Sequence, residues 1–134
     1  MFELFTRRKP QSGRVLVIDD EPLARTLFRR SLQSAGFDVV VAESGSEGLE
    51  KLRQDPDIRI VLLDLNMPDM DGHAFRREQR NDPRLKDVPT VVVTGEPLSR
   101  LFDSDLHAVE YLLKPVGREH LISVVSDYCE PLNW

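Results

Sequence analysis

The stretch over residues 61–72 constrains the fold most strongly, because an apolar run there stops abruptly at an acid. The run over residues 60–63 is followed by Asp64 and then by a loop that holds a proline, further acids and amides, and a glycine. A short apolar run bounded by turn residues predicts a buried strand. In open parallel sheets, ligands bind just outside the carboxyl ends of the strands. Asp64 therefore stands where a functional side chain is expected.

Four other apolar runs predict strands and alternate with helical patterns. The predicted strands cover residues 14–18, 37–42, 58–63, 88–93 and 109–113, and the predicted helices cover residues 22–35, 46–54, 72–80, 98–106 and 118–128. This alternation is typical of a parallel sheet covered by helices on both faces. Right-handed crossovers allow the strand order 2-1-3-4-5. We therefore expect an α/β fold with a doubly wound, five-stranded parallel sheet in that order.

Two helices carry specific expectations about burial. The spacing of apolar residues over 22–35 predicts a buried face that includes Leu27 and Phe28. The helix over 72–80 is mostly polar, and Ala74 and Phe75 are its expected buried contacts.

The chain of 134 residues suits one domain, and its composition excludes several classes of function. We expect a flexible tail over residues 1–12, the domain over 13–130, and a C-terminal tail or linker start over 131–134. The net charge of −5 argues against nucleic acid or an anionic membrane as the main partner. No signal peptide or membrane-spanning run is present, so we expect a cytoplasmic protein. The single cysteine, Cys129, has no partner for an internal disulfide.

Four predicted strands end in polar residues that would meet at one edge of the sheet. They are followed by Asp19 and Asp20, by Asp64, by Thr94 and by Lys114. Crowded carboxylates are costly unless a cation joins them, and Mg²⁺ suits a site of a few carboxylates and phosphate oxygens. A carboxylate nucleophile, a metal ion, a lysine and a hydroxyl are the parts that phosphoryl transfer needs. The pattern predicts a site for that chemistry.

With these motifs, residues 14 to about 129 resemble the receiver domains of two-component response regulators, and the chemotaxis type in particular. The resemblance implies a flavodoxin-like (βα)5 receiver fold with Asp64 as the phospho-acceptor. It implies that Asp19, Asp20, Asp64 and the backbone carbonyl of Asn66 hold Mg²⁺.

The resemblance also assigns roles in switching and in the rate of dephosphorylation. Thr94 is similar to the switch hydroxyl, Tyr111 to the switch aromatic, and Lys114 to the lysine that pairs with the phosphoryl group. The resemblance also implies a cis peptide bond between Lys114 and Pro115. Asn66 and Glu96 hold the positions that tune hydrolysis in the family. An amide and a carboxylate there resemble the rapidly self-dephosphorylating type, and we expect a short-lived phosphoryl group.

One segment departs from the family pattern. A Gly-Ala pair is usual before the fifth strand, whereas this chain has His107 and Ala108. The segment over residues 94–114 is also shorter than expected, so the helix predicted within it is expected to be altered.

The resemblance implies protein partners and no catalysis beyond the domain's own phosphorylation and dephosphorylation. The donor would be a histidine kinase or a histidine phosphotransfer protein that docks near the first helix. A downstream protein would read the fourth helix, fifth strand and fifth helix, and the domain would be a monomer or a phosphorylation-dependent dimer.

Three alternatives remain open at this point. The chain could be a receiver module cut from a longer regulator or hybrid kinase, or a degenerate receiver that takes no phosphoryl group. It could also be a Mg²⁺-dependent phosphatase of the aspartyl-phosphate type, although Asn66 stands where such enzymes have a second acid. A flavodoxin-like nucleotide-binding protein fits less well, because no glycine-rich phosphate loop follows the first strand.

Overall fold

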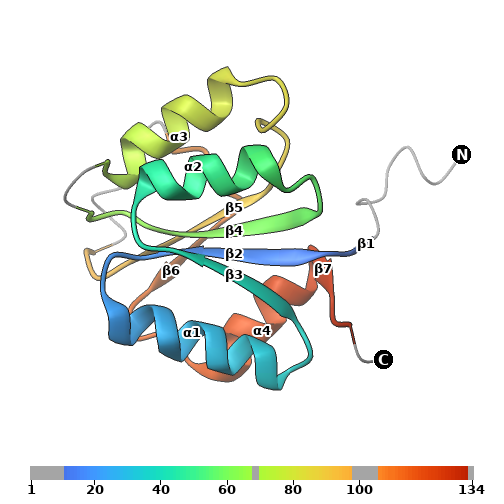
Figure 1. The fold of residues 1–134 in the computed structure, drawn as a ribbon. Coiled ribbons are helices and arrows are strands. Elements are labelled where there is room, and N and C mark those ends of the chain that lie inside the picture. Colours follow the sequence, from blue (N-terminus) through green and yellow to red (C-terminus); the bar gives the residue numbers. More distant parts are fainter. Residues whose placement is uncertain (1–10, 68–69, 98–105, 133–134) are drawn as a thin grey trace, which may run out of the picture.

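The computed structural model describes residues 11–67, 70–97 and 106–132 (Figure 1). In chain order the elements are β1 (Gln11–Ser12), β2 (Arg14–Ile18), α1 (Pro22–Ser34), β3 (Asp38–Ala42), α2 (Gly45–Gln54), β4 (Ile58–Asp64), α3 (Gly72–Asn81), β5 (Thr90–Thr94), β6 (Glu110–Leu113), α4 (Arg118–Ser126) and β7 (Cys129–Glu130). Within the described ranges, no helix has both the length and the apolar character needed to cross a bilayer.

Five strands form one parallel sheet in the order β3-β2-β4-β5-β6, which confirms the expected order. Helices α2 and α3 cover one face of the sheet, and α1 and α4 cover the other (Figure 1). The register pairs Ile18 with Leu63, Asp64 with Val93, and Thr94 with Leu113. The carboxyl ends of four strands therefore lie level with one another at one edge of the sheet.

The strands read as continuous apolar runs because both of their faces are buried. In β2, Val15 and Val17 pack in the cluster beneath α1 and α4, whereas Leu16 and Ile18 pack in the cluster beneath α2 and α3. Side chains alternate between the two faces of a strand, so a strand covered on both sides needs apolar residues at every position. The same alternation divides β4 between the two cores.

Three helices begin where local chemistry favours a start. Pro22 occupies the first turn of α1, where the missing amide donor costs nothing. The Ser44 hydroxyl accepts a hydrogen bond from the Glu47 amide at the start of α2, and the Asp71 carboxylate accepts one from the Ala74 amide at the start of α3. Such N-caps satisfy amides that lack partners within the helix.

The two ends of the described chain pair with each other in a small second sheet. Gln11 and Ser12, which we assigned to the flexible tail, form β1 and pair in parallel with Cys129 and Glu130 in β7. The sequence offers no periodicity for strands this short, so their pairing could only be seen in the folded structure.

The helix expected over residues 98–106 falls almost entirely outside the described residues, and only Leu106 at its end can be placed. The Leu106 side chain is fully buried. The other four predicted helices are present, with bounds that differ by a few residues from the expected ones.

Gly72 provides a test of how closely α3 approaches the strand that carries Asp64. A Cβ atom at Gly72 would lie 2.8 Å from the Cα atom of Leu65 and 2.6 Å from its Cδ2 atom. We expect Gly72→Ala to lower the free energy of unfolding by about 1–3 kcal/mol, because the backbone beside Asp64 would have to shift. Urea denaturation would measure the change.

Gly95→Ala is the matched control for this substitution. A Cβ atom at Gly95 meets no atom within 4 Å, so the control should keep or slightly raise stability. Equal losses in the two variants would contradict the close approach of Gly72 to Leu65.

Candidate functional site

Three carboxylates gather at the carboxyl edge of the sheet. Asp19 and Asp20 follow β2, and Asp64 is the last residue of the neighbouring strand β4. Each offers an oxygen atom, and these oxygens lie within 4.8 Å of one another. Asp19 and Asp64 are buried and Asp20 is exposed, so the cluster has two buried carboxylates and one that faces solvent.

The ammonium group of Lys114 lies against this cluster. Its Nζ atom is 3.2 Å from Asp19 Oδ2 and 3.7 Å from Asp64 Oδ1. The backbone amide of Lys114 donates a 2.8 Å hydrogen bond to the Thr94 carbonyl, which extends the pairing of β5 and β6 by one residue. The Lys114–Pro115 peptide bond is cis, as the family resemblance implied.

The charges of the site do not balance in the absence of a further cation. Burial, together with the neighbouring Asp19 carboxylate, raises the pKa of Asp64 to about 6 against the opposing effect of Lys114. Burial by itself lowers the pKa of Lys114, but the Asp64 and Asp19 carboxylates outweigh it and the pKa is raised. One ammonium group faces three carboxylates, so the site retains negative charge that a divalent cation can neutralise.

Backbone amides hold the carboxylates in place. The Glu21 amide donates to Asp19 Oδ1 at 3.0 Å, and the Asn66 amide donates to Asp64 Oδ1 at 3.4 Å. The Arg25 guanidinium donates to the backbone carbonyl of Asp19 at 2.9 Å. These contacts fix the loop that follows β2 and aim both buried carboxylates at the same space.

Thr94 ends β5, the strand between those that carry Asp64 and Lys114. Its side chain is fully buried, and its hydroxyl accepts a 3.0 Å hydrogen bond from the Glu96 amide. At the next residue, Gly95, a Cβ atom would meet no atom within 4 Å apart from its chain neighbours. The strand order thus brings Thr94 to the same edge as the acids, on the side of Lys114.

The remaining predicted residues differ in their exposure and in their contacts. Asn66 is exposed in the loop after β4, and Glu96 is half-buried in the loop after β5. Tyr111 packs in a cluster with Leu65 and Leu106, and its hydroxyl accepts a 3.2 Å hydrogen bond from the Ala108 amide.

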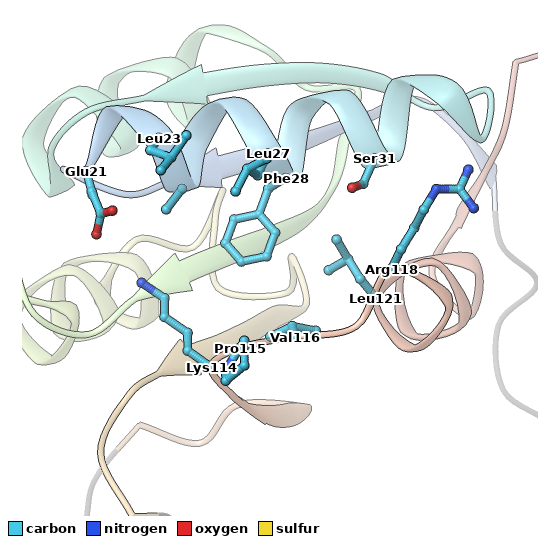
Figure 2. A pocket seen from close by; sticks show the side chains of 11 residues that line it. Glu21, Leu23, Leu27, Phe28, Ser31, Lys114, Pro115, Val116, Arg118 and Leu121 are labelled. Carbon is cyan, nitrogen blue, oxygen red and sulfur yellow. The ribbon is translucent and has the colours of Figure 1, made fainter.

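A groove of about 380 Å³ runs beside the site, between α1 and the segment that leads from Lys114 into α4 (Figure 2). Lys114 and Glu21 lie at one end of it, and Phe28 forms part of its floor. Leu23 and Leu27 line the groove while 62% and 56% exposed. The expected burial of Leu27 is therefore wrong, because the helix turns this side chain toward the groove and leaves the sheet contact to Phe28 and its neighbours.

Sequence reasoning missed two buried polar residues of α3. Arg76 and Gln79 are 5% and 0% exposed, although the helix was expected to bury Ala74 and Phe75. Phe75 is fully buried as predicted, whereas Ala74 is only half-buried. The spacing of Gly72, Phe75, Arg76 and Gln79 is that of one helix face, but the two polar residues conceal the signal.

Comparison with known proteins assigns the family. The model for the response regulator receiver domain matches residues 15–126, and the chain therefore belongs to this family. Its members act in two-component signalling, and the observed sheet is the one found in chemotaxis receivers.

Individual relatives differ in how much of their length this chain covers. The chain is 30% identical over 117 residues to the protein PilH of Pseudomonas aeruginosa, covering 85% of this chain and 95% of that one. It is 33% identical over 124 residues to the sensor histidine kinase CheAY of Helicobacter pylori, covering 90% of this chain but only 15% of that kinase. The crystal structure of the response regulator TrrA from Thermotoga maritima in complex with Mg²⁺ and BeF superposes with a TM-score of 0.75 at 33% identity, covering 84% of this chain and 96% of that one.

The crowding of acids predicts how stability depends on pH in metal-free buffer. The pKa of Asp64 is about 6 in the folded protein and about 4 in an unfolded chain, so the folded state binds this proton more tightly. The stability that Asp64 contributes should therefore fall as the pH rises from about 4 to about 6. Asp64→Asn removes this loss, and we expect it to raise the free energy of unfolding near pH 7 by about 1–2 kcal/mol.

Urea denaturation with a chelator present, at several pH values, would measure this effect. The difference between Asp64→Asn and the wild type should vanish below about pH 3, since the carboxyl group is then protonated in both the folded and the unfolded state. Asp87→Asn, a change at an exposed acid, should leave the profile unchanged. A constant difference across the pH range would contradict the charge argument.

Proposed function

We propose that this protein accepts a phosphoryl group on Asp64 and passes the signal to protein partners by a conformational change. The observation that carries the proposal is the meeting of the Asp64 carboxylate with two further acids and the Lys114 ammonium at one sheet edge. Membership of the receiver family supports the same function. A helix cap or a surface ion pair would not need four strand ends to converge.

The donor set fits a hard divalent cation, and we propose Mg²⁺. Asp19, Asp20, Asp64 and the backbone carbonyl of Asn66 would hold it, because oxygen atoms at this spacing suit that ion. When bound, Mg²⁺ supplies positive charge that offsets the repulsion between the carboxylates and the incoming phosphoryl oxygens.

Phosphoryl transfer then needs little covalent chemistry from the protein. A carboxylate oxygen of Asp64 attacks phosphorus in line with the phosphohistidine nitrogen of the donor. The P–N bond breaks as the P–O bond forms, and the imidazole nitrogen keeps the electron pair. Lys114 pairs with the transferred oxygens, and its place between Asp19 and Asp64 suits that role. Positioning and charge carry most of the catalysis.

Thr94 and Tyr111 would convert the new charge into a change of shape. In this structure the Thr94 hydroxyl accepts a hydrogen bond from the Glu96 amide, and a hydroxyl that accepts such a bond can still donate its proton to a phosphoryl oxygen. Movement of Thr94 toward Asp64 would leave space that the Tyr111 ring can enter. A partner with different affinities for the two arrangements would read the surface around residues 98–128.

The groove beside the site suits the phosphoryl donor, a histidine kinase or a histidine phosphotransfer protein. The exposed side chains of Leu23 and Leu27 offer apolar contact, and Lys114 at the end of the groove marks the reacting edge (Figure 2). A donor helix packed against α1 would bring its phosphohistidine toward Asp64.

Phosphorylation at Asp64 can be measured directly by intact mass. With Mg²⁺ and acetyl phosphate or phosphoramidate, the wild type should gain one phosphoryl group, and Asp64→Asn should gain none because it lacks the acceptor. Asp20→Asn should slow the gain at least about tenfold by weakening the metal site. If the wild type gained no mass and also failed to bind beryllofluoride, the domain would be a degenerate receiver.

Asn66 and Glu96 should shorten the lifetime of the phosphoryl group, because an amide and a carboxylate beside it can orient an attacking water. We expect Asn66→Ala and Glu96→Ala each to slow the loss of phosphoryl mass about tenfold or more, in line with the usual size of such positioning and proton-transfer effects. Glu110→Ala, a change at an exposed acid on the edge strand β6, is the control. A wild-type lifetime of many hours would contradict the proposed role of both residues.

A further inference from the structure

Arg76 is a charged side chain in the core whose hydrogen-bond partners among the described residues are neutral. It projects from α3 and is 5% exposed. Burial lowers the pKa of its guanidinium, but an arginine remains charged at any physiological pH. A buried charge is costly unless every donor is satisfied, and an ion pair is the usual solution. All the hydrogen-bond partners that the described residues provide for Arg76 are uncharged.

Two of these hydrogen bonds connect α3 to the turn over residues 106–108, which precedes β6. Arg76 Nε donates to the Leu106 carbonyl at 2.7 Å, and Nη2 donates to the His107 carbonyl at 2.9 Å. The forked geometry of the guanidinium lets one side chain hold two successive peptide groups. The turn over residues 106–108 is thereby tied to α3.

The rest of the guanidinium joins a small group of buried polar side chains. Nη1 donates to Gln79 Oε1 at 2.7 Å and contacts Thr90 Oγ1 at 3.3 Å, and the Thr90 hydroxyl donates to the same Gln79 oxygen at 2.9 Å. Gln79 Nε2 donates to the Leu85 and Val88 carbonyls. We call Arg76, Gln79 and Thr90 the Arg76 network. Every side-chain nitrogen and oxygen atom of this network has a hydrogen-bond partner, which fixes the position of the guanidinium.

The turn that the Arg76 network holds is strained. His107 has φ 49°, in the left-handed region that favours glycine. This is the position where the family resemblance led us to expect glycine. A strained residue keeps its conformation only when its surroundings hold it, and the contact of its carbonyl with Arg76 Nη2 does so.

The same turn contacts Tyr111. The Ala108 amide, one residue after His107, donates to the Tyr111 hydroxyl at 3.2 Å. Tyr111 and Ala108 also pack against the buried Leu106 side chain. The orientation of the tyrosine ring therefore depends on where the turn lies, and the turn depends on Arg76.

We propose that Arg76 is a positioning residue that fixes the turn over residues 106–108 and, through the Ala108 amide, holds the Tyr111 ring in the orientation seen here. The contact exists without phosphorylation. Its importance for signalling rests on the proposed function, in which Tyr111 changes orientation when Asp64 is phosphorylated. The turn then stays in place while the ring leaves the Ala108 amide.

Arg76→Met tests the proposal, with Thr90→Val as the matched control. The methionine keeps an apolar stem of similar length but loses both contacts with the turn. Thr90→Val removes hydrogen bonds from the same Arg76 network but none that reaches residues 106 or 107. Both variants should lose stability, so stability alone would not separate a positioning role from a structural one.

Amide hydrogen exchange at Ala108 separates the two roles. We expect exchange at Ala108 to accelerate about tenfold in Arg76→Met, the change that loss of about one such hydrogen bond produces, and to stay within about twofold of the wild type in Thr90→Val. Equal exchange in Arg76→Met and the wild type would overturn the proposal, as would equal acceleration in both variants.

Arg76→Lys provides a second variant if Arg76→Met fails to fold. Lysine keeps the charge, but its ammonium lacks the fork that holds two carbonyls at once. The exchange rate at Ala108 should then lie between that of the wild type and the roughly tenfold higher rate expected when both Arg76 contacts are lost. Exchange identical to that of the wild type would contradict a role for the two-carbonyl contact.

NMR signals of the Tyr111 ring, recorded with and without Mg²⁺ and beryllofluoride, test whether Arg76 influences the proposed switch. In Arg76→Met without beryllofluoride, the Tyr111 signals should shift toward those of the beryllofluoride-bound wild type. Unchanged Tyr111 signals would overturn the proposal. We expect Arg76→Met still to accept a phosphoryl group at Asp64. If the wild type accepted none, that result would count against the proposed function and not against the positioning role of Arg76.

Discussion

The repulsion between buried carboxylates at one edge of the sheet is the constraint on which the rest of the site depends. Asp19 and Asp64 are held within reach of each other by a parallel register that the two apolar cores enforce. Within the described part of the chain, the ammonium group of Lys114 is the one that lies against them. The folding energy of the sheet thus maintains an arrangement that the charges alone would disperse. This imbalance of charge favours the binding of a cation at the edge, and under the proposed function the edge then accepts a phosphoryl group.

Much of the fold and most of the charged site follow from the sequence for a simple reason. Apolar runs that end in acids, in Thr94 or in Lys114 mark the carboxyl ends of strands, and a parallel order places those ends side by side. Neither inference requires knowledge of side-chain packing. The positions of Asp19, Asp64 and Lys114 could therefore be predicted before the structure was known.

The features that escaped prediction depend on packing between elements that are distant in sequence. Leu27 has the spacing of a core residue, yet it lines a groove because the neighbouring segment leaves that side of α1 open. Arg76 is of a residue type that usually lies on the exposed face of a helix. It is buried because a turn about thirty residues later presents two carbonyls to it. Local periodicity contains no information about a partner that arrives from another part of the chain.

The pairing of β1 with β7 determines where the described chain enters and leaves the domain. Both strands adjoin the amino end of the main sheet, since β1 leads directly into β2 (Figure 1). Asp64 is the last residue of β4 and therefore lies at the opposite, carboxyl end of this parallel sheet. The described chain thus enters and leaves the domain at adjacent points, both at the end of the sheet opposite the carboxylates. A molecule that approaches Asp64 therefore reaches that edge of the sheet without passing the β1–β7 pair.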